Sequence, residues 1–125
     1  MRELVFNLDK HGLNTVFEPY EELALQSLWS SPELSSQQVH AYVNAELGKA
    51  GTGISRASII YFLNEMVDRC FLDCREVTGK GGYKRLYRFP AKLGTEKLFR
   101  EDLANMILRH LHENIISYTS VLACE

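Results

Sequence analysis

Three stretches within the first 70 residues of the chain place apolar residues at helical spacing and predict three helices. The first stretch, "YEELALQSLW", follows Pro19, a residue that suits the first turn of a helix. The second, "SSQQVHAYVNAELG", begins with Ser35 and has Gln38 three residues later, which is a capping-box pattern. The third helix is expected over residues 55–70, because Ser55 can cap its start.

The helix over residues 55–70 divides into two faces when its residues are placed about 100° apart. The face expected to lie in the core comprises Ile59, Leu63, Met66 and Cys70, flanked by Ile60, Phe62 and Val67. The opposite face comprises Ala57, Tyr61, Asn64 and Asp68. Arg56 stands at the open start of this helix, so a polyanion would meet the N-terminal half first.

Alternating apolar residues predict two β-hairpins. An N-terminal hairpin is expected over residues 3–18, where Leu4, Phe6 and Leu8 alternate before a polar turn. A second hairpin is expected over residues 72–89, because "FLDCREV" and "YKRLYRF" flank the glycine-rich loop "TGKGG". Pro90 ends its second strand.

A final long helix is expected from about Thr95. Its apolar stripe consists of Leu103, Ile107, Leu111, Ile115, Tyr118 and Leu122. A stripe that continues for about five turns beyond a compact domain needs a partner, and the symmetric partner is the same helix of a second subunit. The alternative is that this helix packs back on its own domain.

Charge is distributed unevenly over the 125 residues, which are enough for one domain. The whole chain has a net charge of −2, yet residues 72–92 hold six Lys or Arg and two Asp or Glu, a balance of +4. Basic residues gathered on one hairpin of an otherwise acidic chain favour contact with phosphates. The alternative is a solvated hairpin edge that is kept basic against strand aggregation.

Several other classes of protein are disfavoured by the sequence. The chain has none of the motifs of phosphate-binding loops, dinucleotide-binding folds, zinc proteases or serine hydrolases, so we expect no enzyme and no cofactor. The cysteines, Cys70, Cys74 and Cys124, lack the spacing of a metal site and are expected to be reduced and mostly buried. Without a signal peptide or a long apolar segment, no membrane association and a cytoplasmic location are expected.

Two helices, a short connector, a third helix and a hairpin form the winged-helix arrangement. We therefore expect an α+β fold with a winged helix-turn-helix domain over residues 1–92 and a dimerisation helix over residues 93–125. In this arrangement the third helix enters the major groove of DNA, and the hairpin, called the wing, follows the backbone.

The segments "LALQSLWSSPELSSQQVHAYVN" and "SRASIIYFLNEMVDRCFL", with "YRF" in the wing, resemble the penicillinase-repressor family of winged-helix transcriptional regulators. The resemblance covers roughly residues 20–90. It implies DNA contacts by Arg56, Ser58 and Tyr61 of the recognition helix and by basic residues of the wing. The chain departs from the family at Cys70, where the family has glycine.

These patterns predict a homodimeric, sequence-specific regulator of transcription that binds double-stranded DNA, most simply as a repressor. The expected DNA-binding residues are Ser55, Arg56, Ala57, Ser58, Tyr61, Lys80, Lys84, Arg85 and Arg88. The alternative function is a winged-helix module that binds another protein through its acidic half and the exposed face around Tyr61. No metal site is expected.

Overall fold

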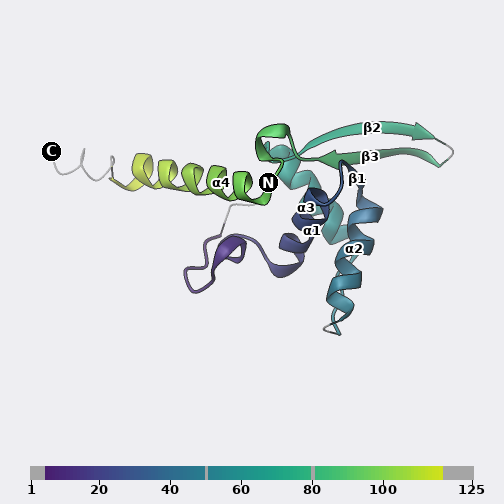
Figure 1. Cartoon of the computed structure of the whole chain (residues 1–125), viewed down its shortest axis with the longest axis horizontal. Coiled ribbons are helices and arrows are strands. Elements are labelled where there is room, and N and C mark those ends of the chain that lie inside the picture. The colour runs from purple at the N-terminus through teal and green to yellow at the C-terminus, as the bar shows by residue number, and fades with distance from the viewer. Residues whose placement is uncertain (1–4, 50, 80, 117–125) are drawn as a thin grey trace.

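The computed structural model describes residues 5–49, 51–79 and 81–116. The elements in chain order are the 3-10 helix η1 (Gly12–Thr15), α1 (Pro19–Trp29), β1 (Leu34–Ser35), α2 (Ser36–Gly48), α3 (Arg56–Asp68), β2 (Asp73–Gly79), β3 (Gly82–Arg88), the 3-10 helix η2 (Ala91–Leu93), α4 (Glu96–Leu111) and the π-helical turn η3 (His112–Ile116). Helices α1, α2 and α3 gather beside the base of the hairpin, whereas α4 projects away from them (Figure 1). This is the predicted α+β winged-helix arrangement.

The helices begin where local capping groups satisfy their free backbone N–H groups. The backbone N–H of Ser35 donates to Gln38 Oε1 at 2.9 Å, and the N–H of Gln38 donates to Ser35 Oγ at 3.3 Å, which confirms the predicted capping box of α2. Helix α1 has a corresponding box, in which the N–H of Glu18 donates to Glu21 at 2.9 Å. Ser55 caps α3 as predicted.

The sheet is antiparallel and has the strand order β1-β3-β2. Strands β2 and β3 form the predicted wing and pair from Asp73 opposite Arg88 to Gly79 opposite Gly82. The short strand β1 adds to β3, with Leu34 opposite Tyr87. The wing is therefore attached to the body of the domain through the segment that links α1 and α2.

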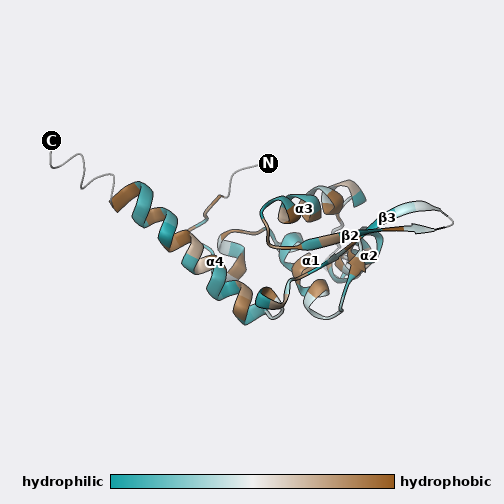
Figure 2. Ribbon diagram, turned by 90° about the horizontal axis from the view of Figure 1, so that it is seen from above, coloured by the Kyte–Doolittle hydropathy of each residue, from teal (hydrophilic) through white to brown (hydrophobic). Residues whose placement is uncertain are grey.

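An aromatic cluster joins the start of α4 to the rest of the core. The ring centroid of Phe99 lies 6.0 Å from Phe17, 5.5 Å from Trp29, 5.3 Å from Phe71 and 5.7 Å from Phe89. Trp29 also stacks on Phe89 at 4.8 Å, and its indole N–H donates to the carbonyl of Leu93 at 3.2 Å. The first half of α4 is thus fixed to the domain, while hydrophobic residues recur along α4 to its far end (Figure 2).

The prediction of an N-terminal hairpin over residues 3–18 was wrong for the part that the structure describes, since residues 5–18 contain no strand. Gly12 reverses the chain at a φ of 62°, and η1 follows. Leu13 and Phe17 are both buried, and their spacing of four suits one side of a helical turn, not an alternating strand. One backbone bond, from Asn7 N to Thr15 O at 2.8 Å, closes this loop.

The predicted burial of Cys70 was also wrong. Helix α3 ends at Asp68, so Cys70 lies just beyond it, with its side chain exposed and a φ of 67°. The N–H groups of Phe71 and Leu72 then donate to Met66 O at 2.9 and 3.3 Å, which satisfies the end of the helix. Cys74 is partly buried, and Cys124 lies outside the described residues.

Candidate nucleic-acid interface

The start of α3 presents the predicted helix residues to solvent. Ser55 Oγ accepts the backbone N–H of Ser58 at 3.1 Å and lies 2.9 Å from Ser58 Oγ, so both hydroxyl groups belong to the cap. Arg56 and Ala57 are exposed, and Tyr61 is 59% exposed one turn later. A capped helix start with an arginine and a tyrosine on its surface is the arrangement by which helices read base edges in a DNA groove.

The connector before α3 is fixed by two polar side chains of α2. Asn44 Oδ1 accepts the backbone N–H of Ile54 at 2.9 Å, and His40 Nε2 lies 2.9 Å from the Ile54 carbonyl oxygen. These contacts hold the residue immediately before the cap of α3. The angle at which α3 leaves the connector is therefore set by α2.

Strand pairing divides the basic residues of the wing between its two faces. Side chains of paired residues lie on the same face, so Arg85 shares a face with Glu76 and Tyr87, and Tyr83 lies further along this face. Lys84 and Arg88 lie on the other face. The predicted basic contacts Lys84, Arg85 and Arg88 therefore do not form a single surface. Lys80 lies outside the described residues.

The face of the wing with Arg85 is joined to α3 by Asn64. Tyr87 Oη donates to Asn64 Oδ1 at 2.7 Å, and Arg85 Nη1 donates to the same oxygen at 3.0 Å. Asn64 follows Tyr61 by three residues on α3, so these bonds place Arg85 beside the exposed face of α3. The sequence did not reveal this role of Asn64, because its partners lie more than 20 residues away.

The electrostatic setting of this junction reflects burial and neighbouring polar groups. Burial raises the pKa of the Tyr87 hydroxyl, which keeps it neutral and able to donate. The pKa of Arg85 is raised, most by the neighbouring Cys74 and further by Tyr87 and Glu76. Arg85 Nε also lies 3.8 Å from Glu76 Oε1. Arg85 is therefore fully charged, and its guanidinium group is held by its contacts with Asn64 and Glu76.

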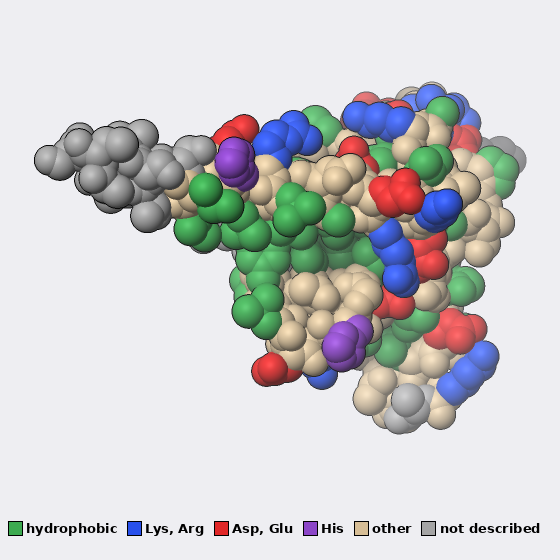
Figure 3. Space-filling model, turned by 60° about the vertical axis from the view of Figure 1, so that its left-hand side comes forward, with side chains coloured by type: hydrophobic (Ala, Val, Ile, Leu, Met, Phe, Trp, Pro, Cys, Tyr) green, Lys and Arg blue, Asp and Glu red, His purple; other side chains and the backbone are tan. Residues whose placement is uncertain are grey.

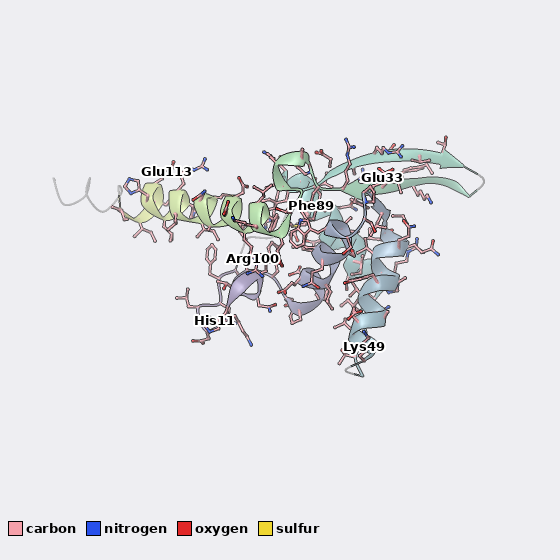
Figure 4. The ribbon with its side chains drawn as sticks, viewed as in Figure 1. His11, Glu33, Lys49, Phe89, Arg100 and Glu113 are labelled. Atoms are coloured by element: carbon pink, nitrogen blue, oxygen red, sulfur yellow. The ribbon has the colours of Figure 1, made fainter. Side chains whose placement is uncertain are left out.

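A second contact fixes the base of the wing on its opposite face. Arg75 Nε donates to Glu33 Oε2 at 3.0 Å, and Arg75 Nη2 donates to Glu33 Oε1, so the two side chains form a bidentate pair. Figure 4 shows Glu33 beside the base of the wing, in the segment between α1 and α2. The hydrogen bond from Arg75 holds the pKa of Glu33 below its usual value.

The predicted stripe of α4 begins inside the domain and ends outside it. Leu103 is only 5% exposed and belongs to the core of its own chain, and Ile107 is half-buried. Leu111 is exposed, and Ile115 in η3 is 57% exposed. Tyr118 and Leu122 lie outside the described residues. Only the distal part of the described stripe is therefore available to a partner.

A second apolar stripe of α4 is exposed. It comprises Ala104, Leu108 and Leu111 of α4 and continues with Ile115 of η3, at spacings of four, three and four residues, and it is called the distal stripe below. Leu108 is 63% exposed and was missing from the predicted set, although the 4-3-4 spacing could have identified it. Figure 3 shows hydrophobic side chains gathered along α4 and continuing toward the domain.

A cavity of about 480 Å³ lies between the N-terminal segment, the start of α1 and the second half of α3. Its lining is mixed, with Phe17, Phe62 and Met66 among the apolar residues. Asn14 Oδ1 is buried without a hydrogen-bond partner among the described residues. Within the same residues no cluster of ligands suits a metal ion, and no helix is long and apolar enough to cross a membrane.

Three solved structures are similar to this chain. PadR from Bacillus subtilis, crystallised in complex with operator DNA, is 24% identical over 62% of this chain and 44% of its own, with a TM-score of 0.49. TA0346 from Thermoplasma acidophilum, provisionally assigned as a transcriptional regulator, is 17% identical over 79% of this chain and 90% of its own, with a TM-score of 0.51. A PadR-family transcriptional regulator from Eggerthella lenta is 13% identical over 75% of this chain and 80% of its own, with a TM-score of 0.45.

These comparisons concern the fold. No family model matches the chain, and no curated protein matches it. The chain spans less than half of the length of Bacillus subtilis PadR. The likeness to TA0346 supports the α+β winged-helix arrangement over most of the chain.

The predicted resemblance to the penicillinase-repressor family is not supported, because no family model, that of this family included, matches the chain. The motifs that suggested it lie at core positions. Leu28, Leu63 and Tyr87 are buried, and Trp29 stacks on Phe89. Side chains at such positions serve the packing of the fold, so they indicate the fold and do not distinguish families.

Proposed function

We propose that this protein is a non-catalytic, homodimeric regulator of transcription that binds specific sequences in double-stranded DNA, as a repressor. The observation that supports it most is the hydrogen bond from Arg85 to Asn64 of α3, which lies on the same exposed side of the helix as Tyr61, one turn closer to the helix start. One surface thereby combines the side chains proposed to contact bases, Arg56 and Tyr61, with a cation, Arg85, proposed to contact the DNA phosphates. Such a division of labour is the basis of specific DNA binding.

In the proposed complex, α3 enters the major groove with its N-terminal half. Arg56 is positioned to donate to guanine edges or to phosphate, and the exposed ring of Tyr61 to contact a base edge or sugar. Ser55, Ala57 and Ser58 line the approach, and their small size lets the helix backbone come close. The acidic residues of α3 lie in its second half, away from this approach.

The wing supplies phosphate contacts through Arg85, aided by the exposed Tyr83 on the same face. Lys84 and Arg88 lie on the opposite face and would act mainly by attraction over a longer distance. Lys80, which follows β2 in the sequence, remains a proposed contact. The charge of +4 within residues 72–92 offsets the negative charge of the remaining chain at this surface.

Dimerisation is proposed to occur through the distal stripe of α4. Its 4-3-4 spacing is that of a helix pairing with another helix, and Leu108 and Ile115 are more than half exposed in the single chain. A two-fold dimer would present two recognition helices to half-sites about one helical turn apart. The predicted partner residues Tyr118 and Leu122 continue the same spacing.

Selection from a random pool of duplex DNA tests the proposed function. We expect enrichment of a motif with two-fold symmetry, whereas the absence of any enrichment at low salt would refute DNA reading and favour the protein-binding alternative. With the selected duplex, affinity is then measured against salt for Arg85→Ala and for the matched control Arg88→Ala. Loss of one phosphate contact in Arg85→Ala should reduce the slope by about 0.9, and Arg88→Ala should change it less.

Sedimentation of Leu111→Glu tests the dimer interface. Because a buried carboxylate in a helix pair is costly, we expect this variant to be monomeric at concentrations at which the original protein is a dimer. Leu98→Glu is the matched control: Leu98 is also exposed on α4, about 140° around the helix from Leu111. Equal loss of the dimer in both variants, or in neither, would refute the assignment to the distal stripe.

A further inference from the structure

We propose that Asn64 is a positioning residue that holds the wing against the recognition helix and thereby determines how selectively DNA is read. This inference rests on the proposed DNA-binding function. It concerns a residue that the helix pattern places on the DNA-facing side of α3, next to Tyr61. The structure gives that residue a different role from direct contact with a base.

One oxygen atom of Asn64 connects the two parts of the interface. Its Oδ1 accepts hydrogen bonds from Tyr87 at 2.7 Å and from Arg85 at 3.0 Å. A side-chain carbonyl oxygen has two lone pairs, so these two donors fill its capacity. Both donors belong to one face of β3, two residues apart, whereas Asn64 belongs to α3. The distance between the wing and the recognition helix is therefore defined at this atom.

The two donors differ in burial, so one of them anchors Asn64 and the other is held in place by it. Tyr87 is only 2% exposed, so its ring is fixed by the core and its hydroxyl holds Asn64 in place. Arg85 is exposed, and Asn64 on one side and Glu76 on the other restrict its guanidinium group. The packed core thus fixes Tyr87, Tyr87 fixes Asn64, and Asn64 restricts Arg85, the cation proposed to contact the DNA backbone. A preordered arginine loses less conformational entropy on binding.

The chemistry of the amide suits this task. An aliphatic side chain at position 64 would leave the buried Tyr87 hydroxyl without its acceptor and release Arg85. A carboxylate would accept both hydrogen bonds but would add a negative charge near DNA phosphates. Asparagine supplies the acceptor without the charge.

The proposal is tested by the ratio of affinities for the selected duplex and for a scrambled duplex at one salt concentration. Asn64→Ala should lower this ratio about tenfold, since it removes two hydrogen bonds at the interface. Tyr87→Phe should lower it about threefold, although the buried Tyr87 cannot reach DNA. The double variant should fall no further than Asn64→Ala, because both changes remove the same junction.

Two further variants separate positioning from stability. Asn64→Asp should retain the ratio while binding both duplexes more weakly, since it keeps the acceptor and adds charge. Asp68→Ala, at an exposed position one turn further on α3, should retain the ratio. The melting temperature of each variant without DNA establishes that it is folded.

Two results would overturn the role of Asn64 while the original protein still selects a motif. An unchanged ratio in Tyr87→Phe would show that Asn64 acts by direct contact with DNA. Unchanged ratios in all variants, together with lower melting temperatures, would show a role in stability alone. Failure of the original protein to enrich any motif would instead refute the proposed function, and this proposal with it.

Discussion

Replacing Cys70 by glycine should stabilise the protein, because the backbone at this position is left-handed. Its φ is 67°, a conformation that costs L-residues roughly 1–2 kcal/mol and costs glycine little. Glycine also increases the conformational entropy of the unfolded chain, which offsets about 0.4–1 kcal/mol of this gain. The thiol is exposed, so the substitution loses little burial. We expect a net gain of about 0.5–1 kcal/mol.

The gain is measured by urea unfolding of Cys70→Gly, with Cys70→Ala as the matched control. Trp29, the single tryptophan of the chain, stacks on Phe89 against the core, so its fluorescence reports loss of the packed domain. Cys70→Ala removes the sulfur but keeps Cβ, and should leave the free energy of unfolding nearly unchanged. If both variants are destabilised equally, the thiol makes a contact that outweighs the backbone term, and the reasoning is refuted.

Three further variants test individual contacts. The pKa of Glu33 is lowered below 4.5 in the folded state, so its pairing with Arg75 stabilises the protein above that pH and is lost as the pH falls. Glu33→Gln should therefore lose less stability on acidification than the original protein. Unfolding midpoints measured across acidic pH would show this difference. The raised pKa of Tyr87 means that its hydroxyl contributes fully to the free energy of unfolding below about pH 10 and contributes less as the pH rises further. Tyr87→Phe should therefore lose less stability at alkaline pH than the original protein. An unchanged alkaline profile would exclude this cause. Asn44→Ala should cost about 1–3 kcal/mol by leaving the Ile54 N–H without its acceptor, measured by urea unfolding against the exposed control Asn105→Ala.

The parts of the fold that the sequence predicted are those determined by neighbouring residues. The caps at Ser35 and Ser55 involve partners three residues away, so the local sequence contains the whole interaction. The wing was evident from two alternating segments around a glycine-rich loop. At the N-terminus, alternation suggested strands, but burial of Leu13 and Phe17 against the helices favoured a helical turn. Tertiary packing overrode the local pattern there.

The candidate site was harder to predict, because its geometry depends on contacts between distant segments. Arg75 binds Glu33 across 42 residues, and Arg85 binds Asn64 across 21. From the sequence, the basic wing residues formed one group, and only the pairing of β2 with β3 assigns Arg85 and Arg88 to different faces. Asn64 was assigned to the exposed face of α3, which is correct in angle but does not reveal that β3 approaches that face.

The final helix shows how a periodic pattern can combine two functions. Residues spaced by four advance about 40° around a helix at each step, since four residues exceed one turn of 3.6. The predicted series from Leu103 through Ile107 to Leu111 therefore rotates from the core of its own domain toward solvent. Alternating steps of four and three cancel this rotation, and they select Ala104, Leu108, Leu111 and Ile115 as one straight row. The inward residues attach α4 to its own domain, and the straight row stays exposed. One helix can therefore both pack on its own domain and, as proposed, pair with the same helix of a second subunit.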